Sequence, residues 1–214
     1  MIVEGLTEQT FCESVLQPFF SNKEIDVRPS KIKKSKGGIV HWFNIKKQIE
    51  NYLKQDSGVF VTLMIDFYGI YDKHGFPGWQ ESKLISDKYE RIKFVEDAMV
   101  RDIREDLKRR FIPYIQLHEF EGLLFSDLSI YNELFDDDEF LNYEYLVETI
   151  SEFDNPEMIN EGKGTAPSKR LENKIFKRYD KVFYGSLIAE SIGLDKIRIK
   201  CRGFDKWIKD LSDI

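Results

Sequence analysis

One continuous run of apolar residues limits the possible folds of this chain more strongly than its composition does. The stretch "SGVFVTLMID" (57–66) is rich in β-branched and aromatic residues and shows no regular alternation of apolar and polar positions. A strand with this pattern is buried on both faces, which is typical of parallel sheets in α/β proteins. We therefore expect helices on both sides of a sheet that contains this strand.

Strand and helix patterns alternate along the rest of the first 120 residues. Short strands are predicted at 1–4, 24–29 and 112–117, and helices at about 7–20, with Thr7 as N-cap, 42–54 and 82–111. This order predicts an α/β fold with a mostly parallel four-stranded sheet flanked by helices. Only three residues precede Glu4, so the first strand is either very short or begins upstream of Met1.

The last third of the chain reads as helical. Two acidic helical stretches are expected up to about residue 153, and two or three short helices over 168–214, with a break at Gly193. We therefore expect an α/β core over residues 1–125 and a helical elaboration over 126–214 that packs on the core.

Two features of the sequence bear on where the protein works. No apolar run approaches the ~20 residues that span a membrane, and the first residues lack the pattern of a signal peptide. Cys12 and Cys201 have neither metal-ligand spacing nor the density of a disulfide framework. We expect reduced thiols in a cytoplasmic protein, with a long-range disulfide as the alternative.

Charge is distributed unevenly around a net value of −6. Residues 111–162 contain no Lys or Arg, whereas residues 169–209 contain twelve basic residues and five acidic ones. A second basic run, "KIKKSK", covers 31–36. This asymmetry indicates either a polyanion-binding face opposite an acidic one or ordinary solvated helix faces.

Acidic residues follow three of the predicted strands. Glu4 follows the first strand, Asp66 ends the long apolar one, and Glu119 and Glu121 follow "YIQL". Ligands of open α/β sheets bind at the carboxyl ends of the strands, so these acids are expected at one edge. Oxygen ligands favour Mg²⁺ or Mn²⁺. The alternative is that each acid only stabilises the start of the next helix.

The segment "LHEFEGLLFSD" allows two local arrangements. On a strand, Glu119 and Glu121 would share a face; on a helix, His118 and Glu121 would do so. His118 is accordingly a candidate catalytic residue or a hydrogen-bonded structural histidine.

The segment "TAPSKRL" predicts an anion site at a helix start. Free N–H groups in the first turn, next to Lys169 and Arg170, are suited to a phosphate, so we predict that Ser168, Lys169 and Arg170 bind one. Lys33 and Lys34 are weaker candidates for the same role. Contacts of this kind bind nucleic acid without sequence specificity.

"VEGLTE" resembles the first motif of TOPRIM domains, the fold shared by topoisomerases, bacterial primases and OLD-type nucleases. The resemblance implies that Glu4 is a metal-linked general acid or base, followed by the small residue Gly5, and that Glu8 is an additional acid of the OLD-like branch. In that family a later strand ends in Asp-x-Asp and holds the metal. Asp66 matches the first Asp, but Tyr68 occupies the second position.

More closely, the chain resembles the TOPRIM-like domain-of-unknown-function family 4276. The matching stretches are "VEGLTEQTF", "LMIDFYGI" with "GFPGW", "LHEFEGLLFSD", "TAPSKRL" and "CRGFDKWI". Members resemble nucleases and often lie beside ATPase genes in bacterial defence loci. We hypothesise that Glu119 or Glu121 replaces the acid missing at Tyr68.

Two functions of different class follow. The first is a Mg²⁺- or Mn²⁺-dependent nuclease acting on DNA or RNA in phage defence, with Glu4 as general acid or base and Asp66 holding metal together with Glu8 and Glu119 or Glu121. The second is a catalytically degenerate adaptor or sensor, consistent with Tyr68, whose acidic 111–162 segment docks an ATPase partner.

Overall fold

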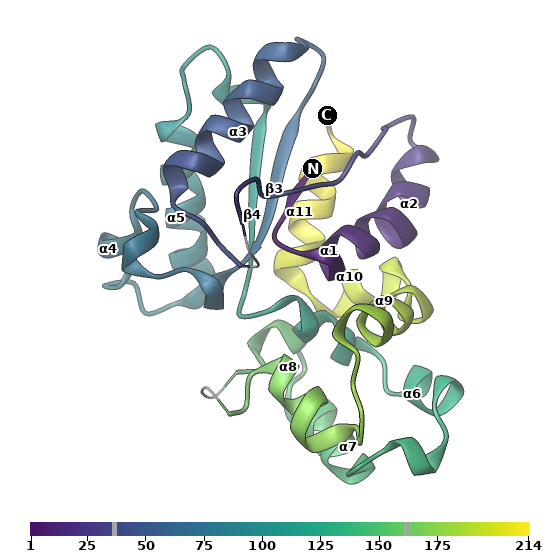
Figure 1. The fold of residues 1–214 in the computed structure, drawn as a ribbon. Coiled ribbons are helices and arrows are strands. Elements are labelled where there is room, and N and C mark those ends of the chain that lie inside the picture. Colours follow the sequence, from purple (N-terminus) through teal and green to yellow (C-terminus); the bar gives the residue numbers. More distant parts are fainter. Residues whose placement is uncertain (36–37, 161, 163) are drawn as a thin grey trace.

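A four-stranded, all-parallel sheet forms the centre of the computed structural model, which describes residues 1–35, 38–160, 162 and 164–214 (Figure 1). The strand order is β2-β1-β3-β4. The strands are β1 (Ile2–Val3), β2 (Ser30–Lys31), β3 (Val61–Asp66) and β4 (Phe111–Gln116). The predicted α/β class is therefore confirmed.

The strands differ greatly in length. β3 pairs with β4 over its whole length, from Val61 opposite Phe111 to Asp66 opposite Gln116. β1 has two residues, and both pair with β2 on one side and with β3 on the other. A first strand of only two residues is thus held in the sheet by two neighbours, and Glu4 follows it directly.

The strand predicted at 24–29 is wrong by several residues. The second strand begins after Pro29, and the N–H of Ser30 donates to the carbonyl of Met1 (2.8 Å). The N–H of Ile32 donates to the carbonyl of Val3 (3.0 Å). Proline has no N–H to give to such a ladder, so pairing starts at the next residue.

Helices cover both faces of the sheet and form a further lobe at one end (Figure 1). In the first half of the chain they are α1 (Leu6–Phe11), α2 (Gln17–Ser21), α3 (Trp42–Gln55), α4 (Trp79–Ser82) and α5 (Lys88–Asp102), with π-helical residues Cys12–Leu16 joining α1 to α2. In the second half they are α6 (Ser129–Leu134), α7 (Tyr143–Glu152), α8 (Pro167–Arg170), α9 (Lys181–Ile192), α10 (Leu194–Lys200) and α11 (Arg202–Ser212).

Two hydrophobic cores lie against the sheet. One contains buried residues of α3 and α5 with β1, β3 and β4 residues such as Leu63 and Ile115. The other contains residues of α1, α9 and α11 with β-strand residues such as Val3 and Met64, whose side chains point to the opposite face. Segments 1–125 and 126–214 share this second core, and their separation into two domains stays a prediction.

Several predicted helix limits require correction. α1 begins at Leu6 with Gly5 as N-cap, so Thr7 is not the cap. The helix expected over 82–111 is shorter, because the Asp87 side chain caps α5 by accepting the N–H of Glu90 (2.9 Å) and the helix ends at Asp102. Apolar residues beyond that end remain buried but follow a non-helical backbone.

The predicted break at Gly193 is confirmed. Its φ of +79° separates α9 from α10, and glycine adopts this conformation without steric cost. Both cysteines are buried free thiols. In the part of the chain that the structure describes, no helix combines the length and the apolar character needed to cross a membrane.

Candidate active site

Two predicted acids meet where β1 and β3 end. Val3 pairs with Met64, which brings Glu4 next to the end of β3. The N–H of Asp66 donates to Oε2 of Glu4 (3.4 Å), and both side chains are half-buried. Parallel pairing of the two strands therefore places these carboxylates at one edge of the sheet, as expected.

Glu8 and Glu121 complete this group, which we call the carboxylate cluster (Glu4, Glu8, Asp66 and Glu121). Glu8 lies in the first turn of α1 and accepts the N–H of Gly5 (2.8 Å). Glu121 lies in the 3₁₀-helical segment η5 (Phe120–Ser126) and is fully buried. Oδ1 of Asp66 accepts the N–H of Phe120 (3.0 Å), which ties η5 to the end of β3.

Lys181 contributes a positive charge to the carboxylate cluster. Its Nζ lies 2.8 Å from Oε1 of Glu121, and its charge also acts on Glu4 and Asp66. Burial alone would lower the pKa of Lys181, but the attraction of Glu121 and Asp66 outweighs burial and raises it. The sequence interpretation missed this residue, because nothing in its local pattern separates it from the other basic residues of 169–209.

Glu4, Asp66 and Glu121 hold protons more tightly than ordinary carboxyl groups. Burial raises the pKa of Glu4 to about 7, the charge of Glu8 adds to the rise, and the hydrogen bond from Asp66 opposes it. Burial and then the charge of Glu4 raise the pKa of Asp66 well above its usual range. Burial also raises the pKa of Glu121, although Lys181 opposes the rise. Glu4 can therefore gain or lose a proton near neutral pH.

The carboxylate oxygens of the cluster suit a divalent cation, although backbone N–H groups and Lys181 already occupy some of them. Carboxylate oxygens are the ligands that Mg²⁺ and Mn²⁺ prefer. Within the described ranges, no group of three or more His, Cys, Asp or Glu side chains is arranged as a metal-binding set. Oε1 of the buried Glu121 is paired with Lys181, and its Oε2 accepts no hydrogen bond from any described residue. A cation would thus find unsatisfied oxygens here once Lys181 moves away from Glu121.

The structure distinguishes the two residues, Glu119 and Glu121, that we hypothesised to replace the acid missing at Tyr68. Glu121 interacts electrostatically with both Glu4 and Asp66. Oε2 of Glu119 instead accepts the N–H of Ser168 (3.0 Å) at the start of α8. Of the two candidates, Glu121 is the one that belongs to the carboxylate cluster.

The local arrangements expected for "HEFE" are both wrong. His118 has a left-handed backbone with φ of +66°, Glu119 is extended, and Glu121 lies in the following 3₁₀ turn. A left-handed residue turns the chain sharply, so neither strand nor helix periodicity applies across it. This turn separates the directions of Glu119 and Glu121.

The His118 ring does not join the carboxylate cluster in the structure. Its Nε2 lies 3.2 Å from Nζ of Lys88, and its Nδ1 lies 3.2 Å from Nδ2 of Asn160. Burial, followed by the charge of Lys88, lowers the pKa of His118 to about 4, so the ring is neutral at pH 7. A catalytic role for His118 stays a prediction.

The predicted phosphate site at α8 is largely occupied by the protein itself. The N–H of Ser168 is bound to Glu119, and Lys169 forms an exposed ion pair with Glu172 (2.5 Å). The Arg170 guanidinium is buried and donates to the carbonyl of Thr165 and the hydroxyls of Tyr145 and Thr149. Arg170 therefore serves the fold, and a carboxylate from the facing loop already fills the helix start.

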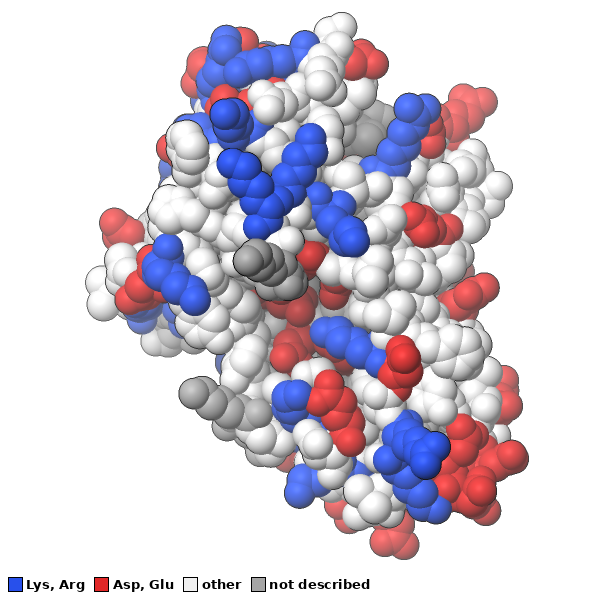
Figure 2. Space-filling model, viewed as in Figure 1, with Lys and Arg blue, Asp and Glu red and all other residues white. Residues whose placement is uncertain are grey.

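Glycine backbones approach Glu4 from the segments after β2 and β3. A Cβ on Gly69 would lie 3.6 Å from Oε1 of Glu4, and one on Gly38, whose φ is +89°, would lie 3.9 Å from it. Lys33 and Lys34 are exposed on the segment that leads toward Gly38, whereas Lys36 lies outside the described residues. Figure 2 shows acidic side chains in a hollow in the middle of this face, with Lys and Arg side chains on both sides of it.

Comparisons with known proteins define the family but no activity. No match is found among curated proteins or among solved structures. The likeness to TOPRIM domains stays a prediction from the motifs. The model of the family described as Domain of unknown function (DUF4276) matches residues 3–212. Because this match covers nearly the whole chain, the protein belongs to the DUF4276 family.

Proposed function

We propose that the protein is a divalent-metal-dependent phosphodiesterase that cleaves DNA or RNA. One observation carries the proposal: the carboxylate cluster gathers four acids at the carboxyl edge of a parallel sheet, around the fully buried Glu121, whose Oε2 has no hydrogen-bond partner among the described residues. Burial, and after it the repulsion of neighbouring carboxylates, raises the pKa values of Glu4, Asp66 and Glu121, and a divalent cation would oppose this rise.

The residues divide into a metal-holding group and a proton-transferring group. Asp66, Glu8 and Glu121 would hold Mg²⁺ or Mn²⁺, which when bound supplies Lewis acidity toward a phosphate and lowers the pKa of water. Glu4, with a pKa near 7, is suited to take a proton from an attacking water and to return it to the leaving oxygen. Lys181 balances the negative charge of the cluster and can contact a phosphate oxygen.

Basic residues beside the cluster support a polyanionic substrate. Lys31 ends β2, the strand that pairs with β1, and Lys33 and Lys34 follow it. All three are exposed, and their segment leads toward Gly38 and Glu4. Lysine contacts to phosphates give affinity that falls with salt and carries no base specificity. We therefore propose binding of nucleic acid without sequence preference.

Nicking of supercoiled plasmid in Mn²⁺ tests the activity. The wild type should nick, and Glu4→Gln should reduce the rate by about 100-fold or more, because it removes the proton acceptor but keeps the shape. Glu190→Gln, on the exposed face of α9, is the matched control and should nick like the wild type. Equal nicking by the Glu4 variant would identify a contaminating nuclease.

Metal binding is measured separately from activity. Electron paramagnetic resonance of Mn²⁺ should show tight binding by the wild type and weak binding by Glu121→Gln, while Glu119→Gln should bind as the wild type does. Wild-type binding by both variants would contradict the assignment of Glu121 as the acid that replaces the one missing at Tyr68.

A second candidate function is an adaptor or sensor without catalysis. The Lys181–Glu121 ion pair supplies an internal cation to the cluster, and Tyr68 stands where a second metal acid is expected. In this case Mn²⁺ would not bind, and the acidic 111–162 segment would dock an ATPase partner. We also propose a role in phage defence, which the family resemblance supports, and a cytoplasmic location, which the free thiols support.

A further inference from the structure

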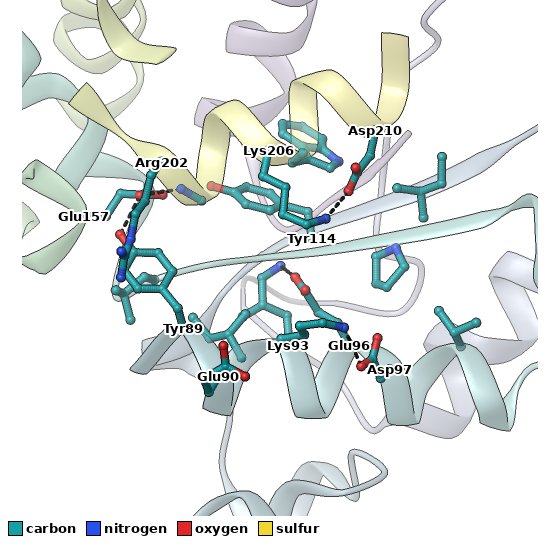
Figure 3. A pocket seen from close by; sticks show the side chains of 18 of the residues that line it. Tyr89, Glu90, Lys93, Glu96, Asp97, Tyr114, Glu157, Arg202, Lys206 and Asp210 are labelled. Carbon is teal, nitrogen blue, oxygen red and sulfur yellow. Dashed lines mark hydrogen bonds and ion pairs between the residues drawn. The ribbon is translucent and has the colours of Figure 1, made fainter. Parts of the chain in front are cut away.

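A groove of about 700 Å³ runs along the outer edge of β4, between α5 and α11 (Figure 3). No residue of the carboxylate cluster lines it. Its floor is the edge strand itself, with half-buried Ile112 and Pro113, and its walls carry Tyr89 of α5 and Trp207 of α11. The volume is that of a typical small-molecule site.

The edge of β4 offers hydrogen-bond acceptors but no free donors. The N–H of Ile115 donates to Oε1 of Glu96 (2.8 Å), so the backbone groups of Ile115, Pro113 and Phe111 face away from β3. Pro113 has no N–H, and the N–H of Phe111 donates to the carbonyl of Lys108. None of the three outward positions thus has a free N–H donor, while their carbonyls point toward the groove.

This pattern blocks one ligand class and favours another. A peptide strand that adds to a sheet edge needs donors and acceptors in alternation, and this edge lacks the donors. A ligand rich in N–H groups meets only acceptors. Outward carbonyls two residues apart recur about every 6.6 Å along a strand. Nitrogens separated by three or four methylene groups can reach successive carbonyls at that interval.

The charges of the groove favour a cation. Six acidic and three basic residues line it. Two of the basic residues are already paired one helical turn away, Lys93 with Asp97 and Lys206 with Asp210, and the third, Arg202, lies over the Tyr89 ring (3.9 Å). Glu157 is also occupied, because it accepts hydrogen bonds from Tyr89 and from backbone N–H groups of α11.

Three carboxylates of the groove lack a cationic partner. Glu90, Glu96 and Asp213 form no ion pair with any residue in 1–35, 38–160, 162 or 164–214. Glu96 points at the edge strand, as Figure 3 shows. Burial raises the pKa of Glu96 to about 8, against the hydrogen bond from Ile115 and the charge of Lys206. A cation in the groove would favour the ionised form of this half-buried acid.

We propose that the β4 groove binds a linear aliphatic polyamine, whose ammonium groups contact Glu96, the rim acids Glu90 and Asp213, and the outward carbonyls of β4. The methylene stretches lie against Pro113, Tyr89 and the other apolar walls. The site is independent of the proposed nuclease activity, because it shares no residue with the carboxylate cluster.

Binding is tested on the whole chain with spermidine as the probe. Isothermal titration calorimetry at low ionic strength should show one saturable site, and the indole ¹⁵N–¹H resonance of Trp207 should shift while those of Trp42 and Trp79 stay in place. Glu96→Gln should weaken the affinity about tenfold or more, because a charge-assisted hydrogen bond is lost. Glu4→Gln should leave the affinity unchanged, which separates the groove from the carboxylate cluster.

Variants at the rim of the groove test the same site without changing Glu96. The exposed rim variant Glu90→Gln/Asp213→Asn should also weaken binding, whereas Glu190→Gln should not. Absence of saturable binding, or an equal loss in Glu190→Gln, would overturn the proposal. Tighter binding of an acetylated arginine amide than of spermidine would show that the groove receives a basic side chain of a partner protein, and the polyamine assignment would be wrong.

Discussion

Replacing Glu4 by glutamine should change how the stability of the protein depends on pH. In the folded protein the pKa of Glu4 is about 7, against an ordinary value of 4.5. The folded state therefore holds this proton more tightly than the unfolded state. The associated stabilisation is complete below pH 4.5 and is lost as the pH rises through 7.

The size of the effect follows from the two pKa values. A difference of about 2.5 units corresponds to about 3 kcal/mol, of which about 2 to 3 kcal/mol falls between pH 5 and pH 8. Water screens the exposed part of the Glu4 carboxyl group, so we expect the lower end of this range. Glu4→Gln removes the titrating group and also lowers the repulsion that acts on Asp66.

Urea denaturation followed by circular dichroism at pH 5, 6, 7 and 8, with EDTA present, measures the effect. The two proteins should be similarly stable at pH 5, and Glu4→Gln should be the more stable one at pH 8. The exposed Glu190→Gln is the control and should follow the wild type. If the profiles of wild type and Glu4→Gln run parallel to within about 0.5 kcal/mol, the cluster does not hold Glu4 as described.

Three other variants test separate contacts. Lys181→Met should lower the unfolding free energy by about 1 to 3 kcal/mol at pH 8, because it leaves the charge of Glu121 without a partner, although the partial exposure of Lys181 limits the loss. Adding Glu121→Gln should restore most of this free energy. A double variant as unstable as Lys181→Met would contradict the pairing. His118→Gly should be more stable than His118→Ala in urea by about 1 kcal/mol, because only glycine adopts a positive φ freely, and equal stabilities would argue against this backbone. Arg170→Met should lower the unfolding free energy by about 2 to 4 kcal/mol, because the hydroxyls of Tyr145 and Thr149 lose their donor. Its salt-dependent affinity for DNA in a filter-binding assay should not change. Lost affinity at unchanged stability would instead support the predicted phosphate role of Arg170.

The features that could be predicted from sequence are those with a strong local signal. The run that forms β3 is long, apolar and β-branched, so its strand and the acid at its end were both identifiable. β2 has two residues, too few for any periodicity, and its position depends on pairing with β1. The choice between Glu119 and Glu121 depends on the left-handed turn at His118. A histidine in a sequence does not predict such a turn.

The residues that could not be predicted are brought to the site from far along the chain. Lys181 reaches the carboxylate cluster only because α9 packs against α1, and no spacing rule connects it to Glu121. The same holds for the carboxylates that fill helix starts, such as Glu157 at the beginning of α11. Their pairing is decided by tertiary packing, which overrides the expectation that a helix start is free for a ligand.

The position of α11 has a consequence for how the protein is made in the cell. Nε1 of Trp207 donates to Oγ1 of Thr62 (2.9 Å), a contact between residues 145 positions apart. A growing chain on the ribosome can finish β3 and β4 long before the helix that covers one face of them has been synthesised. That face, which includes Tyr114 stacked on Trp207 in the folded protein, stays uncovered until α11 leaves the exit tunnel. Termination before α11 is made should therefore leave an apolar face of the sheet exposed and yield an aggregation-prone, chaperone-dependent polypeptide rather than a smaller folded one.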